Sequence, residues 1–387
     1  MGAICEMKHF LFSKFLNYSV KGVGVMSPEE LRRQLHAYPE LSFLEKKTTA
    51  LLRQEIAKWD CFTIKKLKGL QTGLLVEYSP NKGGNFILLR ADLDALLLQE
   101  ETRSSFSSTV DGVMHACGHD IHTAILYGFL LQVAKERPLQ NLLFLFQPAE
   151  ESGGGALKVL EEKNLDCYSI KEAYALHVSD EYNLGRVYSK SGSLFAATCA
   201  FDLTFTGRPA HVAFQDLAAN PLEASFDFLN ALKKKDSSAI VVGLGKMSSG
   251  TVRNITPQTA KLEMTLRSSD EEKLELFFQE LITLAKVTAI RHKVTLHVEM
   301  ESRYAAVMND ENLFKKVSTK LKNLHLCKES MAGEDFGFIS QKYPSVMFWL
   351  GVRQGEKDHR YGLHHPKFLP PMESIAEGIK LFSRLVL

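Results

Sequence analysis

The sequence predicts an α/β fold in which a larger domain with a mixed central sheet carries an inserted, two-layer α+β domain. Wholly apolar strands alternate with helical segments in the first half of the chain, as in NFILLRADLDALLL, NLLFLFQ and EAYALHV. Such strands are typical of a largely parallel sheet buried on both faces. From about Gly185 the pattern changes to the strict alternation of CAFDLTFTG, which is typical of a sheet with one exposed face. After Glu301 the first pattern returns.

The first helix of the larger domain has a clear start signal. In MSPEEL, Ser27 can cap the helix, Pro28 suits its first position and Glu30 completes a capping box. The helical pattern then runs over residues 28–60, and a strand-like segment follows over residues 61–68. The later strands NFILLRADLDALLL, NLLFLFQ, EAYALHV and SVMFWLG alternate with helical segments such as IHTAILYGFLLQVAKE.

The changes of pattern place the inserted domain at residues 185–299. Its expected elements are the strand CAFDLTFTG, a helix over 221–235, a strand over 239–247, the strand AKLEMTLR, a helix over 271–290 and the strand KVTLHVEM. Two helices on one face of an antiparallel sheet, in this order, predict a ferredoxin-like domain. The larger domain is therefore expected to be discontinuous, from residues 27–184 and 300–387.

Composition excludes several classes of function. The 387 residues are 45% hydrophobic and 24% charged, with a formal net charge of +2 and no long run of one sign. This balance gives no electrostatic case for binding nucleic acid or a membrane. Six cysteines without a CxxC pair indicate reduced thiols in a cytoplasmic protein. Residues 1–26 are expected to be an extension, too interrupted by polar residues to cross a membrane.

Side chains capable of chemistry gather after the predicted strands. In open α/β sheets, ligands bind beyond the carboxyl ends of the strands. There the chain places two aspartates, a cysteine, two adjacent glutamates and two histidines: Asp92, Asp94, Cys117, His119, Glu150, Glu151 and His177. The motif GLHHP comes from the returning segment.

Each of these residues alone is weak evidence for a site, but together they predict a metal centre. A single histidine after a strand is more often a surface or core residue, and two adjacent glutamates are usually solvated. Here the glutamates follow an apolar strand and Pro148, where a charge is costly unless it has a partner. A shared metal site explains all of these residues at once.

The residue types indicate which metals the site suits. Cysteine, histidine and glutamate together favour borderline divalent ions such as zinc, manganese, cobalt or nickel. Five ligands exceed the needs of one tetrahedral zinc, which makes two metal ions the expected cofactor. One glutamate can then ligate, while its neighbour takes a proton from water and delivers it to a leaving amine.

Six motifs carry a resemblance to a known family. RADLDAL, MHACGHDIH, QPAEE, ALHV, GEDF and GLHHP occur in the order and spacing of the M20 metallopeptidases, in their amidohydrolase branch. The resemblance runs from about Ser27 to the C-terminus and implies a phosphorylase/aminopeptidase-like catalytic domain with an inserted lid and dimerisation domain. Within the branch, QPAEESGGGAL and GSLFA are most similar to N-acetyldiaminopimelate deacetylases.

The resemblance also implies roles for individual residues in the larger domain. Glu150 takes the general acid–base role, and Asp94 orients a ligand. The roles of His115 and His122 stay open, and a structural or orienting role is favoured for both. The implied metal ligands are Cys117, His119, Glu151, His177 and His364.

In the inserted domain, the resemblance implies that His211 and Asn254 donate hydrogen bonds to the oxyanion that forms during hydrolysis. The surrounding loop departs from the family pattern, because Pro209 and Ala210 replace two glycines. This lid loop is therefore expected to approach substrate differently. Arg253 could bind a substrate carboxylate or serve in a surface or interdomain ion pair, and the same two readings apply to Arg267.

The resulting hypothesis is a dinuclear metal-dependent amidohydrolase that acts on a small N-acyl amino acid. The favoured substrate is N-acetyl-L,L-diaminopimelate, cleaved to diaminopimelate and acetate in lysine biosynthesis. The alternatives are an aminoacylase or hippurate-type hydrolase, a non-catalytic ligand-binding protein on the same fold, and a purely structural zinc site. The resemblance implies a homodimer assembled through the inserted domain, and the scattered cysteines indicate a cytoplasmic location.

Overall fold

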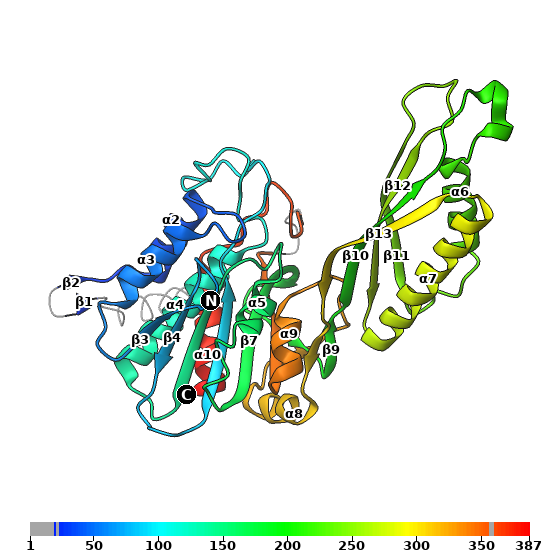
Figure 1. Cartoon of the computed structure of the whole chain (residues 1–387). Helices are drawn as coiled ribbons and strands as arrows, with labels where there is room; N and C mark the ends of the chain where they lie inside the picture. Colours follow the sequence, from blue (N-terminus) through cyan, green and yellow to red (C-terminus); the bar gives the residue numbers. More distant parts are fainter. Residues whose placement is uncertain (1–18, 21–22, 356–359) are drawn as a thin grey trace.

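The computed structural model describes residues 19–20, 23–355 and 360–387, so most of the predicted extension, residues 1–26, lies outside the described residues. Figure 1 shows a larger domain that contains the C-terminus and a smaller, elongated domain beside it. Strands β10 and β13 of the smaller domain lead back to the larger one. Among the described helices, none combines the length and the apolar character needed to cross a membrane.

A mixed sheet forms the centre of the larger domain. Its strand order is β15-β8-β16-β7-β5-β6-β4-β3. The central pairs β16–β7, β7–β5 and β5–β6 are parallel, whereas β4 is antiparallel to both β6 and β3. The strands span Thr63–Lys66 (β3), Leu74–Tyr78 (β4), Phe86–Asp92 (β5), Asn141–Gln147 (β6), Ile170–Asn183 (β7), Val187–Ser189 (β8), Leu324–Leu326 (β15) and Ser345–Arg353 (β16). The predicted mixed α/β sheet is confirmed.

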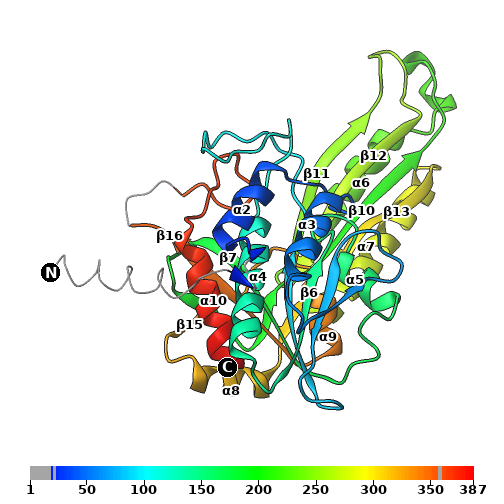
Figure 2. The ribbon, with the colours of Figure 1, turned by 90° about the vertical axis from the view of Figure 1, so that its left-hand side faces the viewer.

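Helices cover both faces of this sheet. One face packs against α2 (Pro28–Ala37), α3 (Lys46–Ile56), α4 (His119–Glu136), α8 (Glu311–Lys320) and α10 (Glu373–Val386). The other face packs against α5 (Gly155–Glu161) and α9 (Phe336–Lys342). Figure 2 shows α4 beside α10 in the layer of helices on this face, and nearly every residue of α4 is buried. Burial on both faces accounts for the continuous apolar runs in β5 and β6.

The start of the first helix is as predicted, but its length is not. The capping box forms, since the Ser27 hydroxyl accepts the N–H of Glu30 and the Glu30 carboxylate accepts the N–H of Ser27. The predicted helical region 28–60 is broken into α2 and α3. The break follows from Pro39, which disfavours helical geometry at Tyr38 and cannot donate a backbone hydrogen bond.

The inserted domain is a four-stranded antiparallel sheet with two helices. Its strand order, β11-β12-β10-β13, and its element order give a ferredoxin-like topology. The alternating residues of β10 and β12 pack against the helices in a separate hydrophobic core. The elements span Ala197–Thr206 (β10), Val212–Leu217 (the 3-10 helix η1), Pro221–Leu232 (α6), Val241–Ser249 (β11), Thr259–Ser268 (β12), Glu271–Arg291 (α7) and Thr295–Tyr304 (β13).

Strand pairing puts the ends of the insertion at different residues from the predicted 185–299. Strand β8 pairs with β16 and β15 in the large sheet, and β9 (Gly192–Phe195) pairs with β14 (Val307–Asn309) beside it. The inserted sheet therefore begins at Ala197 and ends at Tyr304. Gly185, with φ +75°, marks a turn between two strands of the larger domain rather than a domain boundary. The remaining short strands are Ser19–Val20 (β1) and Val23–Gly24 (β2).

Candidate metal centre and active site

The candidate site forms at one edge of the large sheet, where the parallel strands β5 and β6 end beside β7. Strands β7, β5 and β6 are neighbours, and the chain leaves β5 at Asp92 and β6 at Gln147. His177 lies within the buried part of β7, and α4 begins at His119 on the same edge. The topology thus gathers side chains that are far apart in the sequence.

A glycine turn sets the direction of the two residues around it. Gly118 precedes α4 with φ +84°, a conformation that side-chain-bearing residues rarely adopt. A Cβ atom at this position would lie 2.5 Å from Cγ2 of Val178. The turn therefore needs glycine, and it directs Cys117 and His119 into the same buried space.

The five predicted ligands meet at this space, and His364 is the exposed member of the group. Sγ of Cys117 lies 3.4 Å from Nε2 of His177. Oε1 of Glu151 lies 3.7 Å from Nε2 of His119 and 3.4 Å from Nε2 of His364. Potential ligand atoms within 4.8 Å of one another include the sets Cys117–His119–His177 and Cys117–Glu151–His364. Cys117 belongs to both sets, so the donors form one continuous group.

The ligand group fits a divalent cation, because two of its buried donor atoms have no hydrogen-bond partner in the part of the chain that the structure describes. Nε2 of His119 and Oε1 of Glu151 are buried and have no hydrogen-bond partner among the described residues. Nδ1 of His119 donates to the backbone carbonyl of Asp94 at 2.9 Å, and Nδ1 of His177 donates to that of Val178 at 2.8 Å. These bonds leave a lone pair on each Nε2, which is the form that ligates metals.

Glu150 lies next to this group in a setting that increases the affinity of its carboxylate for a proton. Burial and the carboxylates of Glu334 and Glu151 raise the pKa of Glu150 well above its usual range. Nε2 of His119 is 4.0 Å from Oε2 of Glu150, which places the carboxylate at the edge of the ligand group. A carboxyl group with a raised pKa can hold a proton between two transfer steps.

Two carboxylates hold the turn that carries the glutamates. Ala149 adopts φ +56°, and its N–H donates to Oε1 of Glu45 at 2.8 Å. The Asp94 carboxylate accepts the N–H of Glu150 at 3.0 Å and that of Glu151 at 2.9 Å. Asp94 thus supports both glutamates, and its backbone carbonyl also fixes His119.

A buried arginine network beneath the site was not predicted. Arg90 contacts the carboxylates of Asp92 at 2.7 Å, Glu334 at 2.9 Å and Asp335 at 2.5 Å. All four side chains are buried. The N–H of Asp335 lies 3.4 Å from Oε1 of Glu150, so the network reaches the candidate acid–base. The motifs RADLDAL and GEDF contained these residues, but nothing in their spacing indicated that they meet.

The two histidines with open roles differ in their contacts. His122 uses both ring nitrogens, since Nδ1 donates to Asp92 at 2.7 Å and Nε2 accepts the N–H of Val178 at 3.0 Å. His115 is buried, and neither of its ring nitrogens has a hydrogen-bond partner among the described residues. Burial lowers the pKa of His115 to about 4, so its ring is neutral. The contacts of His122 are those of an orienting residue.

The structure brings His211 and Asn254 to each other but not to the ligand group. The N–H of Val212 donates to the carbonyl of Asn254 at 3.1 Å, and Nδ1 of His211 accepts the N–H of Ala213. Both residues are exposed. The short helix η1, which follows His211, lies at the end of the inserted domain far from the larger domain (Figure 1).

The two arginines of the inserted domain have separate surroundings. Nη1 of Arg267 donates to the carbonyl of Met331 in the larger domain at 2.8 Å, which is an interdomain contact. Arg253 lines a cavity of about 820 Å³ that also includes Val212 and Ile255. Arg253 therefore lies close to the two predicted oxyanion donors.

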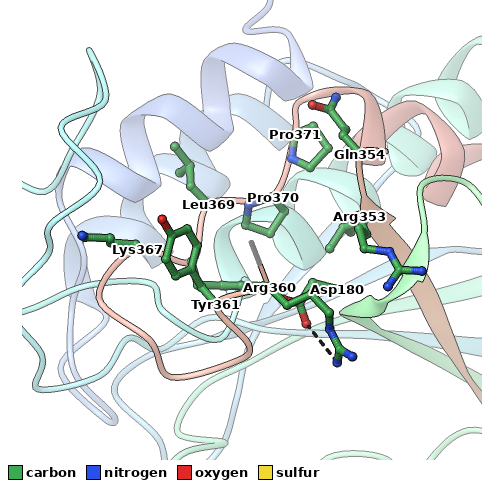
Figure 3. A pocket seen from close by; sticks show the side chains of 11 residues that line it. Asp180, Arg353, Gln354, Arg360, Tyr361, Lys367, Leu369, Pro370 and Pro371 are labelled. Carbon is green, nitrogen blue, oxygen red and sulfur yellow. Dashed lines mark ion pairs between the residues drawn. The ribbon is translucent and has the colours of Figure 1, made fainter. Parts of the chain in front are cut away.

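A second cavity, of about 230 Å³, lies on the segment that carries His364 but includes none of the five ligands. Figure 3 shows Arg353, Arg360 and Lys367 around it, with an ion pair between Arg360 and Asp180. Among the described residues, three cationic side chains and one carboxylate line this cavity, so its lining is positive on balance.

Comparison with known proteins finds relatives of one family that match nearly the whole chain. Residues 88–387 match the family described as peptidase family M20/M25/M40. A protein of Anoxybacillus flavithermus named N-acetyldiaminopimelate deacetylase is 35% identical over 92% of this chain and 96% of its own length. A protein of the same name from Brevibacillus brevis is also 35% identical over the same shares of both chains.

A solved structure supports the same relationship. A dinuclear metal-binding peptidase of the M20 family from Bacillus subtilis superposes with a TM-score of 0.79 at 29% identity. The match covers 92% of this chain and 96% of the other. Both domains are therefore shared with that structure.

Proposed function

The chain belongs to peptidase family M20/M25/M40, and we propose that it is a metal-dependent amidohydrolase that cleaves the amide bond of an N-acyl amino acid. The observation that carries this proposal is the convergence of five metal-capable side chains with one further carboxylate, Glu150, at a single sheet edge. A purely structural metal site has no need for that further carboxylate.

Each residue has a part in the proposed reaction. Bound divalent ions supply Lewis-acid activation of the amide carbonyl and of water. Glu150 takes a proton from the attacking water and transfers it to the leaving amine nitrogen. Asp94 keeps both glutamates and His119 aligned through the hydrogen bonds described above. The residues that would hold one or two ions are Cys117, His119, Glu151, His177 and His364.

We propose N-acetyl-L,L-diaminopimelate as the substrate, with diaminopimelate and acetate as products in lysine biosynthesis. The names of the relatives at about 35% identity support this choice. Another N-acyl amino acid, as cleaved by aminoacylases or hippurate hydrolases, is the alternative with the same chemistry. A non-catalytic ligand-binding protein is the alternative of another class.

The assembly and location remain proposals as well. Strand β11 is an edge of the inserted sheet, and its Val241 and Leu244 side chains are exposed. An apolar edge strand can pair with a second copy of itself. We propose a cytoplasmic homodimer assembled through this edge, in which His211 and Asn254 could act on a substrate held by the other subunit.

The substrate proposal is tested by measuring amine release from a panel of N-acyl amino acids. The panel contains N-acetyl-L,L-diaminopimelate, N-acetylmethionine and hippurate, each with protein that has been stripped of metal and reloaded with manganese, cobalt or zinc. A preference for the diaminopimelate compound of at least tenfold in kcat/KM supports the proposed pathway. Equal or faster cleavage of the other compounds contradicts it, and no metal-dependent cleavage at all favours the binding protein.

A further inference from the structure

One tyrosine joins the inserted domain to the turn that carries the proposed acid–base. Tyr304 is the last residue of β13, at the point where the chain returns to the larger domain. Its hydroxyl donates a hydrogen bond to the backbone carbonyl of Glu150 at 3.1 Å. The two residues are 154 positions apart, so only the fold brings them together.

The chain around Tyr304 is tightly packed against the same region. The ring of Tyr304 lies 6.4 Å from that of Phe338 in α9. The carbonyl oxygen of the next residue, Ala305, lies so close to Gly337 that a Cβ atom there would be 2.1 Å away. Gly337 is two residues after Asp335, whose N–H faces the Glu150 carboxylate. The returning strand thus contacts both the turn and the segment beneath it.

The hydrogen bonds of the turn come from two different domains. Its N–H groups are bound by Glu45 and Asp94, which belong to the larger domain. The carbonyl of Glu150 is bound by Tyr304, which belongs to the inserted sheet. A shift of the inserted domain therefore acts directly on the backbone of Glu150 through this bond.

We propose that Tyr304 is a positioning residue that links the orientation of the inserted domain to the alignment of Glu150. The inference rests on the proposed function, in which Glu150 transfers the proton. Loss of the hydroxyl leaves the carbonyl of Glu150 without this donor and frees the turn to move. Because Tyr304 ligates no metal and acts through Glu150, its loss should slow the chemical step without weakening substrate binding.

The test compares Tyr304→Phe with Tyr78→Phe. The first variant keeps the ring beside Phe338 and removes only the hydroxyl. The second removes a bond of the same kind, from Tyr78 to the backbone carbonyl of Pro138 at 2.8 Å. Pro138 follows the C-terminal end of α4, whereas the ligand group lies at its N-terminal end.

The first measurement is steady-state hydrolysis by the metal-loaded protein, with metal content per chain determined in parallel. We expect Tyr304→Phe to lower kcat about 3- to 10-fold, the range for one lost hydrogen bond, with KM within about twofold. Metal content should stay at the wild-type value, and Tyr78→Phe should keep wild-type kcat. Unchanged kcat in Tyr304→Phe overturns the proposal, as does an equal loss of kcat in both variants.

The second measurement is amide hydrogen exchange of the metal-free protein, followed on a peptide that covers residues 148–154. Faster exchange in Tyr304→Phe than in wild type and Tyr78→Phe supports the link, and equal exchange in all three proteins overturns it. This readout needs no substrate. If the wild-type protein hydrolyses nothing, the proposed function fails, while the exchange rates still decide whether Tyr304 holds the turn.

Discussion

At the scale of single residues, the metal-capable side chains were predictable, whereas the groups that hold them were not. Cys117 stands directly before the glycine turn at Gly118, and Glu151 follows an apolar strand and Pro148, so both lie beside signals that a sequence displays. Glu45 and Tyr304 reach the turn that carries Glu151 from positions 104 and 154 residues away. Such contacts depend on the path of the whole chain, so no local pattern indicates them.

A buried ion pair near the start of α4 leads to a prediction about pH. Burial alone would lower the pKa of His36, but the Asp120 charge and the hydrogen bonds that the His36 ring donates to Asp120 and Glu100 raise it to about 9. The folded-state pKa lies above the unfolded value of 6.5, so protonation of His36 stabilises the fold fully below pH 6.5. This contribution disappears as the pH rises towards 9.

We therefore expect the free energy of unfolding to fall by up to about 3 kcal/mol between pH 6.5 and 9.5, measured by denaturant titration. In His36→Gln this pH-dependent fall in the free energy of unfolding should largely vanish. His292→Gln, which changes a half-buried surface histidine, is the control and should show the same fall as wild type. An equal fall in wild type and His36→Gln would contradict the assignment.

At the scale of elements, hydrophobic periodicity located most strands and helices. It failed where tertiary contacts or a proline determine whether an element forms and where it ends. Strand β4 (Leu74–Tyr78) was not predicted, although Gly73 and the segment SPNKGG flank its short apolar run as turn signals. It pairs with β6 and β3 in the large sheet. The break between α2 and α3 could have been predicted from Pro39. In the inserted domain, sheet alternation and helix length gave all six main elements within a few residues.

Two glycines near the start of α4 allow the effect of a steric clash to be separated from the effect of a strained backbone conformation. Gly118 and Gly112 both have positive φ, but a Cβ atom would clash with Val178 only at Gly118 and meet open space at Gly112. We expect Gly112→Ala to lower stability by about 1 kcal/mol and to leave metal affinity unchanged. Gly118→Ala should lower both stability and metal affinity, the latter at least tenfold, because Cys117 and His119 are displaced. Titration with zinc and thermal unfolding measure the two effects, and equal behaviour of the two variants would rule out the clash.

At the scale of the whole molecule, the domain order was predicted, but the boundary of the insertion was not. The change of pattern at Gly185 falls at a turn between β7 and β8, and β8 still belongs to the large sheet. Pairing partners, rather than residue pattern, set the boundary at Ala197. The sequence also did not predict how the two domains are placed relative to each other. Figure 1 shows η1 at the end of the inserted domain that lies away from the larger domain.

The proposed dimer is tested by placing a charge on the exposed edge strand. Leu244 is 42% exposed on β11, and a lysine there should oppose pairing between two copies. We expect light scattering to give the mass of a dimer for wild type and of a monomer for Leu244→Lys. Leu276→Lys, which changes an exposed leucine on α7, is the matched control and should remain dimeric. A monomeric wild-type protein would contradict the proposed assembly.

Metal removal should lower the thermal stability of the larger domain in particular. Ions that bind only the folded state stabilise it by mass action, and here they also neutralise the buried carboxylates around His119. We expect dialysis against a chelator to lower the melting temperature by several degrees and readdition of zinc or manganese to restore it. An unchanged melting temperature, with metal loss verified by elemental analysis, would show that the ligand group does not hold an ion in the folded protein.

The measurement that tests the central claim most directly is hydrolysis by Glu150→Gln together with its metal content. If Glu150 transfers the proton, kcat should fall at least 100-fold while the metal content per chain stays at the wild-type value. Glu161→Gln, on the exposed end of α5, should behave like wild type. Retention of wild-type kcat in Glu150→Gln, with metal bound, would contradict the account.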